Sequence, residues 1–385
     1  MKVNKQKLKS ALNILFIFGT FILVLYFALS QEDLSTVGQT IRKLDPWWML
    51  GGLGCFLVHM TMEGGLLYVF YRFQRVRVSM RQSILCGLIG MYYSSITPAA
   101  TGGQPMQVYS MKKYGVPAGI TSSALAVKFF CWQCALLLLG AVAWIFNGAA
   151  IHRALGKGIW MVSLGFFING IMVVLVILLA ISRNAVRAII IFCVKAAHRL
   201  RLVKDVQKTS SRWDAALQDF HASVDIITKH PAQYLSLFAL SLIQVTGLMS
   251  ATYCVYRGFG LNAAGYGEIL AIQLMLYIAA SFTPLPGASG AQEGGFYLFF
   301  GSYFPGSIVF GALLVWRFLT YYLSIITGFI GVLIDGSRNR KRATRLAALQ
   351  NAEPADGESD DADEQAQPLD AADDEAQPPD QETEP

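Results

Sequence analysis

Charged residues are scarce in this chain. They make up 15% of its 385 residues, whereas hydrophobic residues make up 54%. The C-terminal segment 351–385 holds 14 of the 25 acidic residues and no Lys or Arg, so residues 1–350 carry 31 basic and 11 acidic groups, a formal charge of +20. This composition excludes an ordinary soluble domain, and apolar runs of about 20 residues predict helices that cross a membrane.

Motifs for soluble enzyme chemistry are also missing. The sequence has no nucleotide-binding P-loop and no Ser-His-Asp arrangement, which removes direct use of ATP and serine hydrolase chemistry. The six cysteines lie mostly in apolar runs, and the Cys131-Trp-Gln-Cys134 spacing has no second pair of metal ligands, so we assign them to packing. We expect no metal, no cofactor and no nucleic-acid partner.

Long apolar runs divide the chain. They are 11–29, 47–71, 82–97, 118–147, 159–181, 232–256, 266–282, 292–304 and 307–334. The first follows several lysines but precedes no small-residue cleavage site, so we interpret it as a retained span rather than a signal peptide.

Basic residues between the runs set the topology, because cytoplasmic loops are enriched in Lys and Arg. The groups assigned to the cytoplasm are the N-terminus, Arg72, Arg75, Arg77, Arg81, Lys112, Lys113, the connection 183–231 and the cluster from Arg338 to Arg345. The groups left outside are Arg42, Lys43, Arg153, Lys157 and Arg257. This assignment requires 82–111 and 266–304 each to enter and leave on one side.

We therefore predict an all-α polytopic membrane protein with about six full spans and two oppositely oriented re-entrant helical hairpins, about 82–111 and 266–304. Eight or nine ordinary spans are the alternative. The membrane domain is expected over 1–337, with amphipathic cytoplasmic helices over 183–231. A basic and then acidic tail over 338–385 is expected to be disordered, because it has few large apolar side chains to bury. Both termini are predicted to lie in the cytoplasm.

Two Gly- and Pro-rich motifs interrupt apolar runs at matching places. The first motif covers 95–105 and the second 281–293; both begin Ser-x-Thr-Pro, at an offset of 186 residues. Broken hydrophobic segments at corresponding places in two halves point to a transporter site near the middle of the membrane. Their free backbone groups can be satisfied only by a solute or a water-filled cavity. In the first motif, Gly102 and Gly103 let the backbone approach a ligand, and Gln104 adds a donor and an acceptor.

Charged residues inside the apolar runs are functional candidates, and four are considered: Glu63, Lys128, Glu293 and Arg317. Lys128 lies too deep for a simple end anchor, although snorkelling to the cytoplasmic face is an alternative. Arg317 either pairs with Glu293 in a structural role or holds a lipid phosphate. Glu63 lies one helical turn after His59, and the two could form a proton site.

The second motif, Pro284-Leu-Pro-Gly-Ala-Ser-Gly-Ala-Gln-Glu293, with Arg317 in the following span, resembles the lysylphosphatidylglycerol synthase/flippase-type transmembrane domain family. Its counterpart there is Pro-Gly-Gly-x-Gly-x-x-Glu and a downstream Arg. The Gly-Gly-Gln-Pro105 segment resembles the family's first motif, and the resemblance covers about 10–335. Two departures are Ala288 in place of Gly, and Val-Lys128-Phe-Phe where members usually carry an acidic-Arg pair.

This resemblance implies translocation of a phospholipid or lipid-linked headgroup, anionic or zwitterionic, across the cytoplasmic membrane. The alternatives are a membrane component of lipid modification, such as phosphatidylglycerol aminoacylation with a separate lipid-modifying enzyme, and a regulatory scaffold. Lysyltransferase activity of this chain is not expected, because no segment could form the soluble catalytic domain; an oligomer is compatible with the pattern. The predicted substrate-binding residues are Thr97, Gly102, Gly103, Gln104, Tyr109, Lys128, Thr283, Gly287, Gly290, Glu293 and Arg317.

Overall fold

The computed structural model describes residues 38, 41–182, 231–281 and 283–350, and the secondary-structure elements in this part of the chain are all helical. The all-α prediction is therefore confirmed for these residues. Five stretches are long and apolar enough to cross a membrane: α3 (Pro46–Phe73), α6 (Ala118–Leu155), α7 (Ile159–Ile181), α10 (Pro231–Gly258) and the stretch Gly306–Ser337. The predicted span 11–29, the connection up to residue 230 and the tail 351–385 lie outside the described residues.

The last long stretch is made of three consecutive helical segments. They are α13 (Gly306–Arg317), a π-helical segment η4 (Phe318–Tyr322) and α14 (Leu323–Gln350). The membrane domain is predicted to end at 337, which matches the end of this apolar stretch at Ser337, and α14 continues as helix to Gln350. The added residues are mainly Arg, Lys, Ala and Leu, which are strong helix formers.

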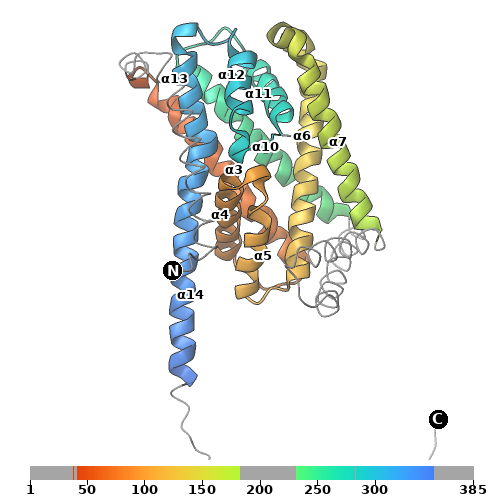
Figure 1. Ribbon diagram of the computed structural model, residues 1–385, viewed down its shortest axis with the longest axis vertical. Helices are drawn as coiled ribbons and strands as arrows, with labels where there is room; N and C mark the ends of the chain where they lie inside the picture. Colours follow the sequence, from red (N-terminus) through yellow and green to blue (C-terminus); the bar gives the residue numbers. More distant parts are fainter. Residues whose placement is uncertain (1–37, 39–40, 183–230, 282, 351–385) are drawn as a thin grey trace, which may run out of the picture. The chain divides into compact units, whose positions relative to one another are not determined.

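Four shorter helices form two hairpins. The first hairpin is α4 (Met80–Ile96), the 3-10 turn η1 (Pro98–Ala100) and α5 (Gly103–Lys113). The second hairpin is α11 (Tyr266–Ala280), η3 (Pro286–Ala288) and α12 (Ala291–Phe300). Figure 1 shows the first hairpin in the lower half of the bundle and the second in the upper half, with their turns facing each other. A 3-10 turn η2 (Gly156–Gly158) joins α6 to α7.

Local sequence explains where these helices begin and end. Asp45 caps α3 by accepting a hydrogen bond from the Trp47 amide at 2.9 Å. Ser79 and Gln82 form a reciprocal capping box at the start of α4. This helix ends at Thr97, whose backbone is extended (φ −116°), because the residue before a proline disfavours helical geometry.

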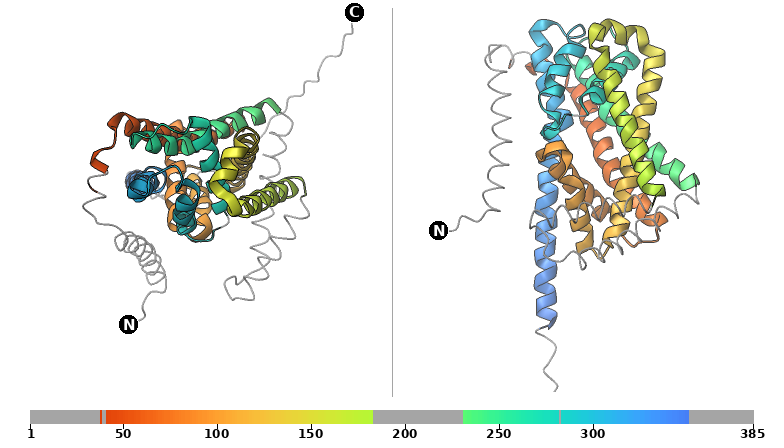
Figure 2. Two further views of the ribbon diagram at one scale, coloured as in Figure 1. Left: turned by 90° about the horizontal axis from the view of Figure 1, so that it is seen from above. Right: turned by 45° about the vertical axis from the view of Figure 1, so that its right-hand side comes forward.

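Each hairpin has its own hydrophobic core. One core packs α4 and α5 against α3 and the first half of α6; the other packs α11, α12 and α13 against α7, α10 and the second half of α6. Along the boundary, α3 and α10 run side by side (Figure 2), with Gly52 facing Cys254 and Gly247 facing Val58. These small residues let the two helix backbones approach, which is typical of helices that pack within a membrane.

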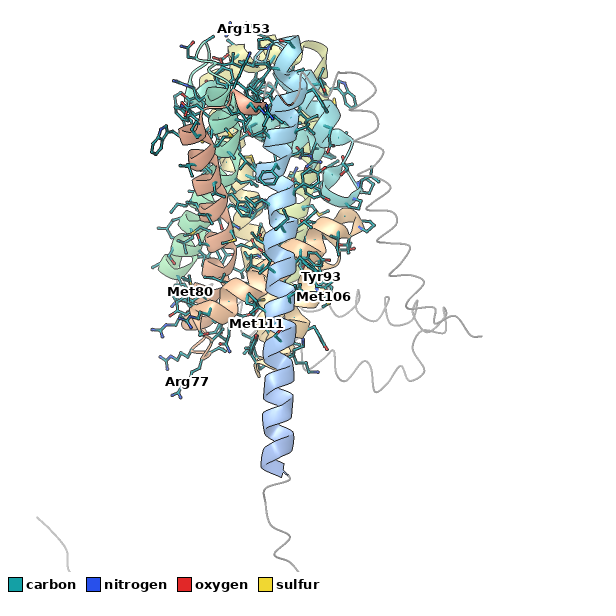
Figure 3. All side chains as sticks on the ribbon, turned by 90° about the vertical axis from the view of Figure 1, so that its left-hand side faces the viewer. Arg77, Met80, Tyr93, Met106, Met111 and Arg153 are labelled. Carbon is teal, nitrogen blue, oxygen red and sulfur yellow. The ribbon has the colours of Figure 1, made fainter. Side chains whose placement is uncertain are left out.

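Two basic residues assigned to opposite sides of the membrane lie at opposite ends of the bundle. Figure 3 shows Arg77 and Arg153 at opposite ends. Arg77 belongs to the Arg-rich α3–α4 loop, which we assigned to the cytoplasm, whereas Arg153 belongs to the group that we assigned outside. This separation agrees with the charge pattern on which the predicted topology depends.

Candidate functional site

The two broken motifs meet at the tips of the hairpins. The backbone amide of Ala99 in η1 donates a hydrogen bond to the Pro284 carbonyl oxygen at 2.8 Å. The Tyr321 hydroxyl, from η4, donates to the Ser95 carbonyl oxygen at 2.9 Å. The first tip is therefore hydrogen-bonded to the second tip and to the last long helical stretch. Both partners are far from the first tip in the sequence.

The first tip is built around Thr97. Its hydroxyl donates to the Tyr93 carbonyl oxygen at 2.6 Å and accepts a hydrogen bond from the Gly102 amide at 2.9 Å, which closes the turn between α4 and α5. A Cβ on Gly103 would overlap the Ser94 side chain and lie 2.8 Å from the Gly90 carbonyl oxygen. Glycine is therefore required at 103 for the two arms of the hairpin to pack this closely.

The second tip depends on left-handed backbone geometry. Gly287 has φ +60° and Gly290 has φ +85°, while Ala288 occupies the same region at φ +50°. The Thr283 amide donates to the Ala280 carbonyl oxygen at 3.1 Å and ends α11. A Cβ on Gly287 would overlap the ring of Tyr321, so the tip rests directly on that ring.

An ion pair holds the second tip to the last long stretch. Arg317 is only 5% exposed, and its Nε donates to Glu293 Oε1 at 2.7 Å. Its Nη2 donates to the Gly287 carbonyl oxygen at 3.1 Å, and the guanidinium lies 4.9 Å from the centre of the Tyr321 ring. Glu293 also accepts a hydrogen bond from the Gly290 amide at 2.6 Å. Of the two arrangements considered for Arg317, the structure shows the ion pair.

Lys128 and Tyr109 lie away from the tips, whereas Gln104 follows Gly103 in the first turn of α5. Lys128, on α6, forms an ion pair with Glu63 of α3 rather than with a residue of either tip. Gln104 and Tyr109 are exposed on α5, where the Lys113 ammonium lies 4.4 Å from the centre of the Tyr109 ring. The structure thus gathers Thr97, Gly102 and Gly103 at one tip, and Thr283, Gly287, Gly290, Glu293 and Arg317 at the other.

Two residues of this arrangement were missed from the sequence. Tyr321 could have been found, because it lies four residues after Arg317 and so on the same helical face. Gln244 on α10 donates to Glu63 Oε2 at 2.8 Å, and nothing in its local sequence indicates this. In 41–182, 231–281 and 283–350, no group of three His, Cys, Asp or Glu side chains could hold a metal ion.

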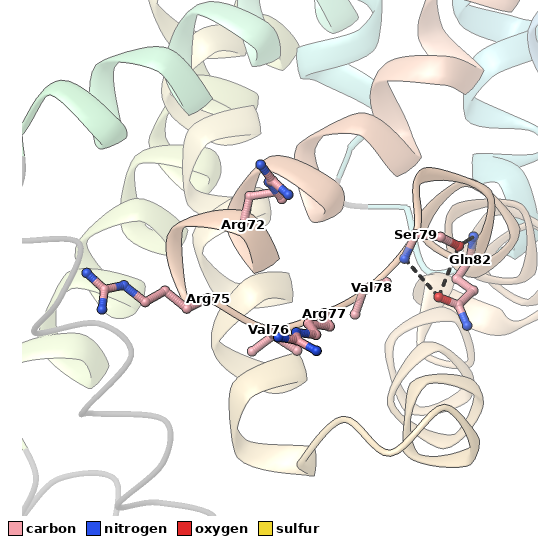
Figure 4. Close-up of a pocket in the computed structure, with 7 residues that line it drawn as sticks. All are labelled: Arg72, Arg75, Val76, Arg77, Val78, Ser79 and Gln82. Atoms are coloured by element: carbon pink, nitrogen blue, oxygen red, sulfur yellow. Dashed lines mark hydrogen bonds between the residues drawn. The ribbon is translucent and has the colours of Figure 1, made fainter.

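A basic cavity of about 740 Å³ lies along the loop that joins α3 to α4 (Figure 4). Its lining residues are Arg72, Arg75, Val76, Arg77, Val78, Ser79 and Gln82. The lining has three positive charges and no acidic residue, and it includes the capped start of α4. This cavity is on the Arg77 end of the bundle in Figure 3.

An apolar groove of about 550 Å³ runs between α3 and α10. It is lined by Gly51, Gly54, Cys55, Val58, Leu242, Ile243, Thr246, Gly247 and Ser250. Small residues on both helices form the floor of the groove, and branched aliphatic side chains flank it. The surface offers room for a hydrocarbon chain but almost no polar partner.

The family described as the lysylphosphatidylglycerol synthase TM region matches residues 10–328. This chain belongs to that family. The match includes both broken motifs, and the resemblance drawn from them is confirmed.

Two curated relatives are similar over most of their length. A UPF0104 membrane protein of Archaeoglobus fulgidus is 24% identical over 259 residues, covering 66% of this chain and 76% of the relative. A UPF0104 membrane protein of Methanothermobacter thermautotrophicus is 22% identical over 323 residues, covering 78% of this chain and 89% of the relative. Both are named as membrane proteins, in agreement with the five apolar helical stretches found among the described residues of this family member.

Proposed function

We propose that this protein moves the headgroup of an anionic or zwitterionic phospholipid, or of a lipid-linked substrate, between the leaflets of the cytoplasmic membrane. The main observation in support of this proposal is the contact between the two hairpin tips, made by the Ala99–Pro284 hydrogen bond. The longest hairpin helix has 17 residues, or about 25 Å, less than the roughly 30 Å hydrocarbon core. Both hairpins are therefore interpreted as re-entrant, entering from opposite faces.

Helix ends at the tips provide sites for an anion. The first tip places the start of α5 next to η1, and the N-cap is Gly102, which has no side chain with which to cap the helix. Backbone N–H groups at such a helix start favour a negatively charged group. Gln104 is exposed in this first turn and can add a donor. A headgroup phosphate at the first tip would satisfy these donors.

Arg317 provides a cation at the second tip. Its Nε and Nη2 are engaged by Glu293 and Gly287, while Nη1 makes no hydrogen bond to the residues that the structure describes. The guanidinium is thus held in a fixed orientation with one nitrogen available to a phosphate oxygen. Arginine suits this role because its charge is permanent and its donors are rigidly placed.

The two surface features support a route for the whole lipid. The cavity lined by Arg72, Arg75 and Arg77 would concentrate anionic headgroups at the proposed cytoplasmic end. The α3–α10 groove is apolar enough for an acyl chain to remain in hydrocarbon while the headgroup crosses. Both termini are then proposed to lie on the cytoplasmic side, by the distribution of Lys and Arg.

The proposal is tested with the full chain in liposomes that contain fluorescent headgroup-labelled phospholipids. Loss of fluorescence to external dithionite would report lipid that reaches the outer leaflet, for anionic, zwitterionic and neutral headgroups in parallel. We expect faster translocation of at least one charged class, and its loss in Arg317→Ala. Arg153→Ala is the control, because Arg153 is exposed and lies 3.8 Å from Glu268, which is in the first turn of α11 and so at the end of that helix remote from the tip.

Two results would contradict the proposal. One is wild-type protein that accelerates no headgroup class above empty liposomes. The other is full activity in Arg317→Ala. Removing 351–385 is expected to leave translocation unchanged, whereas loss of function on that deletion would favour the regulatory scaffold.

A further inference from the structure

A second buried ion pair lies inside the bundle, away from the tips. Glu63 of α3 bonds Lys128 of α6 through Oε1, and its Oε2 accepts a hydrogen bond from Gln244 of α10 at 2.8 Å. The two charged side chains are 15% and 14% exposed, so the pair is not sealed from a water-sized molecule. Such a pair is costly in apolar surroundings, and hydrophobic residues of similar size would often be as stable.

His59 adds a titratable group that has a ring nitrogen without a hydrogen-bond partner among the described residues. It lies one helical turn before Glu63, and its Nδ1 atom is buried with no hydrogen-bond partner in the part of the chain described. Its ring packs edge-on against Trp132, with the ring centres 5.7 Å apart. The titratable groups that face Glu63 from the packed helices are His59 of α3, Lys128 of α6, Cys86 of α4 and Tyr277 of α11.

The pair also borders the first hairpin. A Cβ on Gly87 of α4 would lie 3.2 Å from Glu63 Cγ and 3.0 Å from the Gly64 amide nitrogen. The backbones of α3 and α4 are therefore in direct contact where Glu63 emerges. A change of charge or side-chain position at Glu63 acts directly on the helix that leads to the first tip.

We infer that Glu63 is a proton-binding site inside the bundle, and that the proton it takes up frees the Lys128 ammonium to bind a lipid phosphate. Protonation forms an O–H bond on Glu63 and leaves Lys128 without its counter-charge. The proton comes from water that reaches the partly exposed pair, and it returns to water when the phosphate departs. The phosphate-binding half of the inference rests on the proposed function, whereas proton binding by Glu63 does not.

The first experiment measures lipid distribution under a pH gradient. Full-length protein is reconstituted in liposomes with the membrane potential clamped, and the two leaflets are compared after exchange of labelled phospholipid. One proton per headgroup gives up to about tenfold accumulation in one leaflet per pH unit. We expect this bias in the wild type and in Glu268→Gln, and equal leaflets in Glu63→Gln. A wild type that equilibrates lipid without bias, or a Glu63→Gln variant that keeps the bias, would overturn the coupling.

The second experiment detects the proton itself. Infrared difference spectra of the reconstituted protein, recorded as the pH is lowered, should show a protonated carboxyl band that Glu63→Gln removes and Glu268→Gln retains. A band unaffected by Glu63→Gln would overturn the proton site. If the single variant does not fold, Glu63→Gln with Lys128→Met removes both charges and tests the same band. If no lipid moves in the first experiment but the infrared band still depends on Glu63, the proposed function is wrong and the proton site is retained.

Discussion

The Ala99 amide donates a hydrogen bond to the Pro284 carbonyl oxygen across 2.8 Å, so the two broken motifs are bonded through their backbones. Each of these residues lies in a segment that leaves helical geometry between two short helices. Because both partners are main-chain atoms, the contact depends on the conformation of each tip more than on the side chains. Substitutions that change the shape of one tip should therefore affect the other.

Removing one partner of the Arg317–Glu293 pair should strongly destabilise the protein. In Arg317→Ala, the Glu293 carboxylate is left largely buried without its cation, and we expect a loss of about 3 kcal/mol in the free energy of unfolding. Thermal unfolding in detergent, followed by tryptophan fluorescence, measures this. Arg317→Met combined with Glu293→Gln should lose less than Arg317→Ala, because no unpaired charge remains.

Arg153→Ala is the matched control for this pair. Arg153 is exposed and lies 3.8 Å from Glu268, so its removal should cost less than about 1 kcal/mol. Equal losses for Arg153→Ala and Arg317→Ala would mean that the buried pair does not hold the second tip.

Gly103→Ala should open the first hairpin. The added methyl group would overlap the Ser94 side chain and crowd the Gly90 carbonyl oxygen, which belongs to the backbone and cannot rotate away. We expect a loss of about 1–3 kcal/mol, as is typical of overpacking. Gly294→Ala is the control: no atom lies within 4 Å of its added Cβ, and alanine favours the helix by about 1 kcal/mol. Unfolding temperatures that move in the same direction for both variants would contradict the close packing.

Ala288→Gly should stabilise the second tip. Ala288 has φ +50°, a conformation that costs an L-residue roughly 1–2 kcal/mol and that glycine adopts freely. The greater freedom of glycine in the unfolded chain offsets about 0.5–1 kcal/mol of this gain. We expect a net increase of about 0.5–1 kcal/mol in the unfolding free energy. Ala141→Gly, at an exposed position inside α6, should instead lose about 1 kcal/mol; a loss in both would place Ala288 outside the left-handed region.

Tyr321→Phe separates two roles of one side chain. It removes the hydrogen bond to the Ser95 carbonyl oxygen but retains the ring that lies under Arg317 and beside Gly287. We expect a loss of about 1–2 kcal/mol, since the partly buried carbonyl loses its donor. Tyr68→Phe should change stability little, because the Tyr68 hydroxyl makes no hydrogen bond to the described residues. A Tyr321→Phe variant as stable as the wild type would show that this bond does not tie the last long stretch to the first tip.

Helix positions were largely predictable from the apolar runs. The predicted run 159–181 coincides with α7, and 232–256 differs from α10 by one residue at the start and two at the end. The run 118–147 stops short of α6, which continues to Leu155 through a kink at Asn147. Hydropathy shows where the apolar part of a helix ends, not where the helix itself ends, and α6 continues for eight residues beyond its apolar run.

The site was less predictable than the helices. Glu293 and Arg317 carry opposite charges, lie in apolar segments and are close in sequence, so their pairing could be considered from the sequence. The Glu63–Lys128 pair was not, because partners on separate helices leave no spacing signal in the sequence. Gln104 belongs to the first motif and Tyr109 follows it on α5, and both side chains are exposed.

The sequence by itself determined that this chain is helical and membrane-embedded, and where its helices break, because hydrophobic runs, proline and glycine act locally. Tertiary structure alone decided that the two breaks touch, that Tyr321 supports both tips, and that Lys128 pairs with Glu63. Those outcomes depend on how each helix is rotated and how deep it packs against its neighbours. Many weak contacts along whole helices determine that arrangement together, and no short motif encodes it.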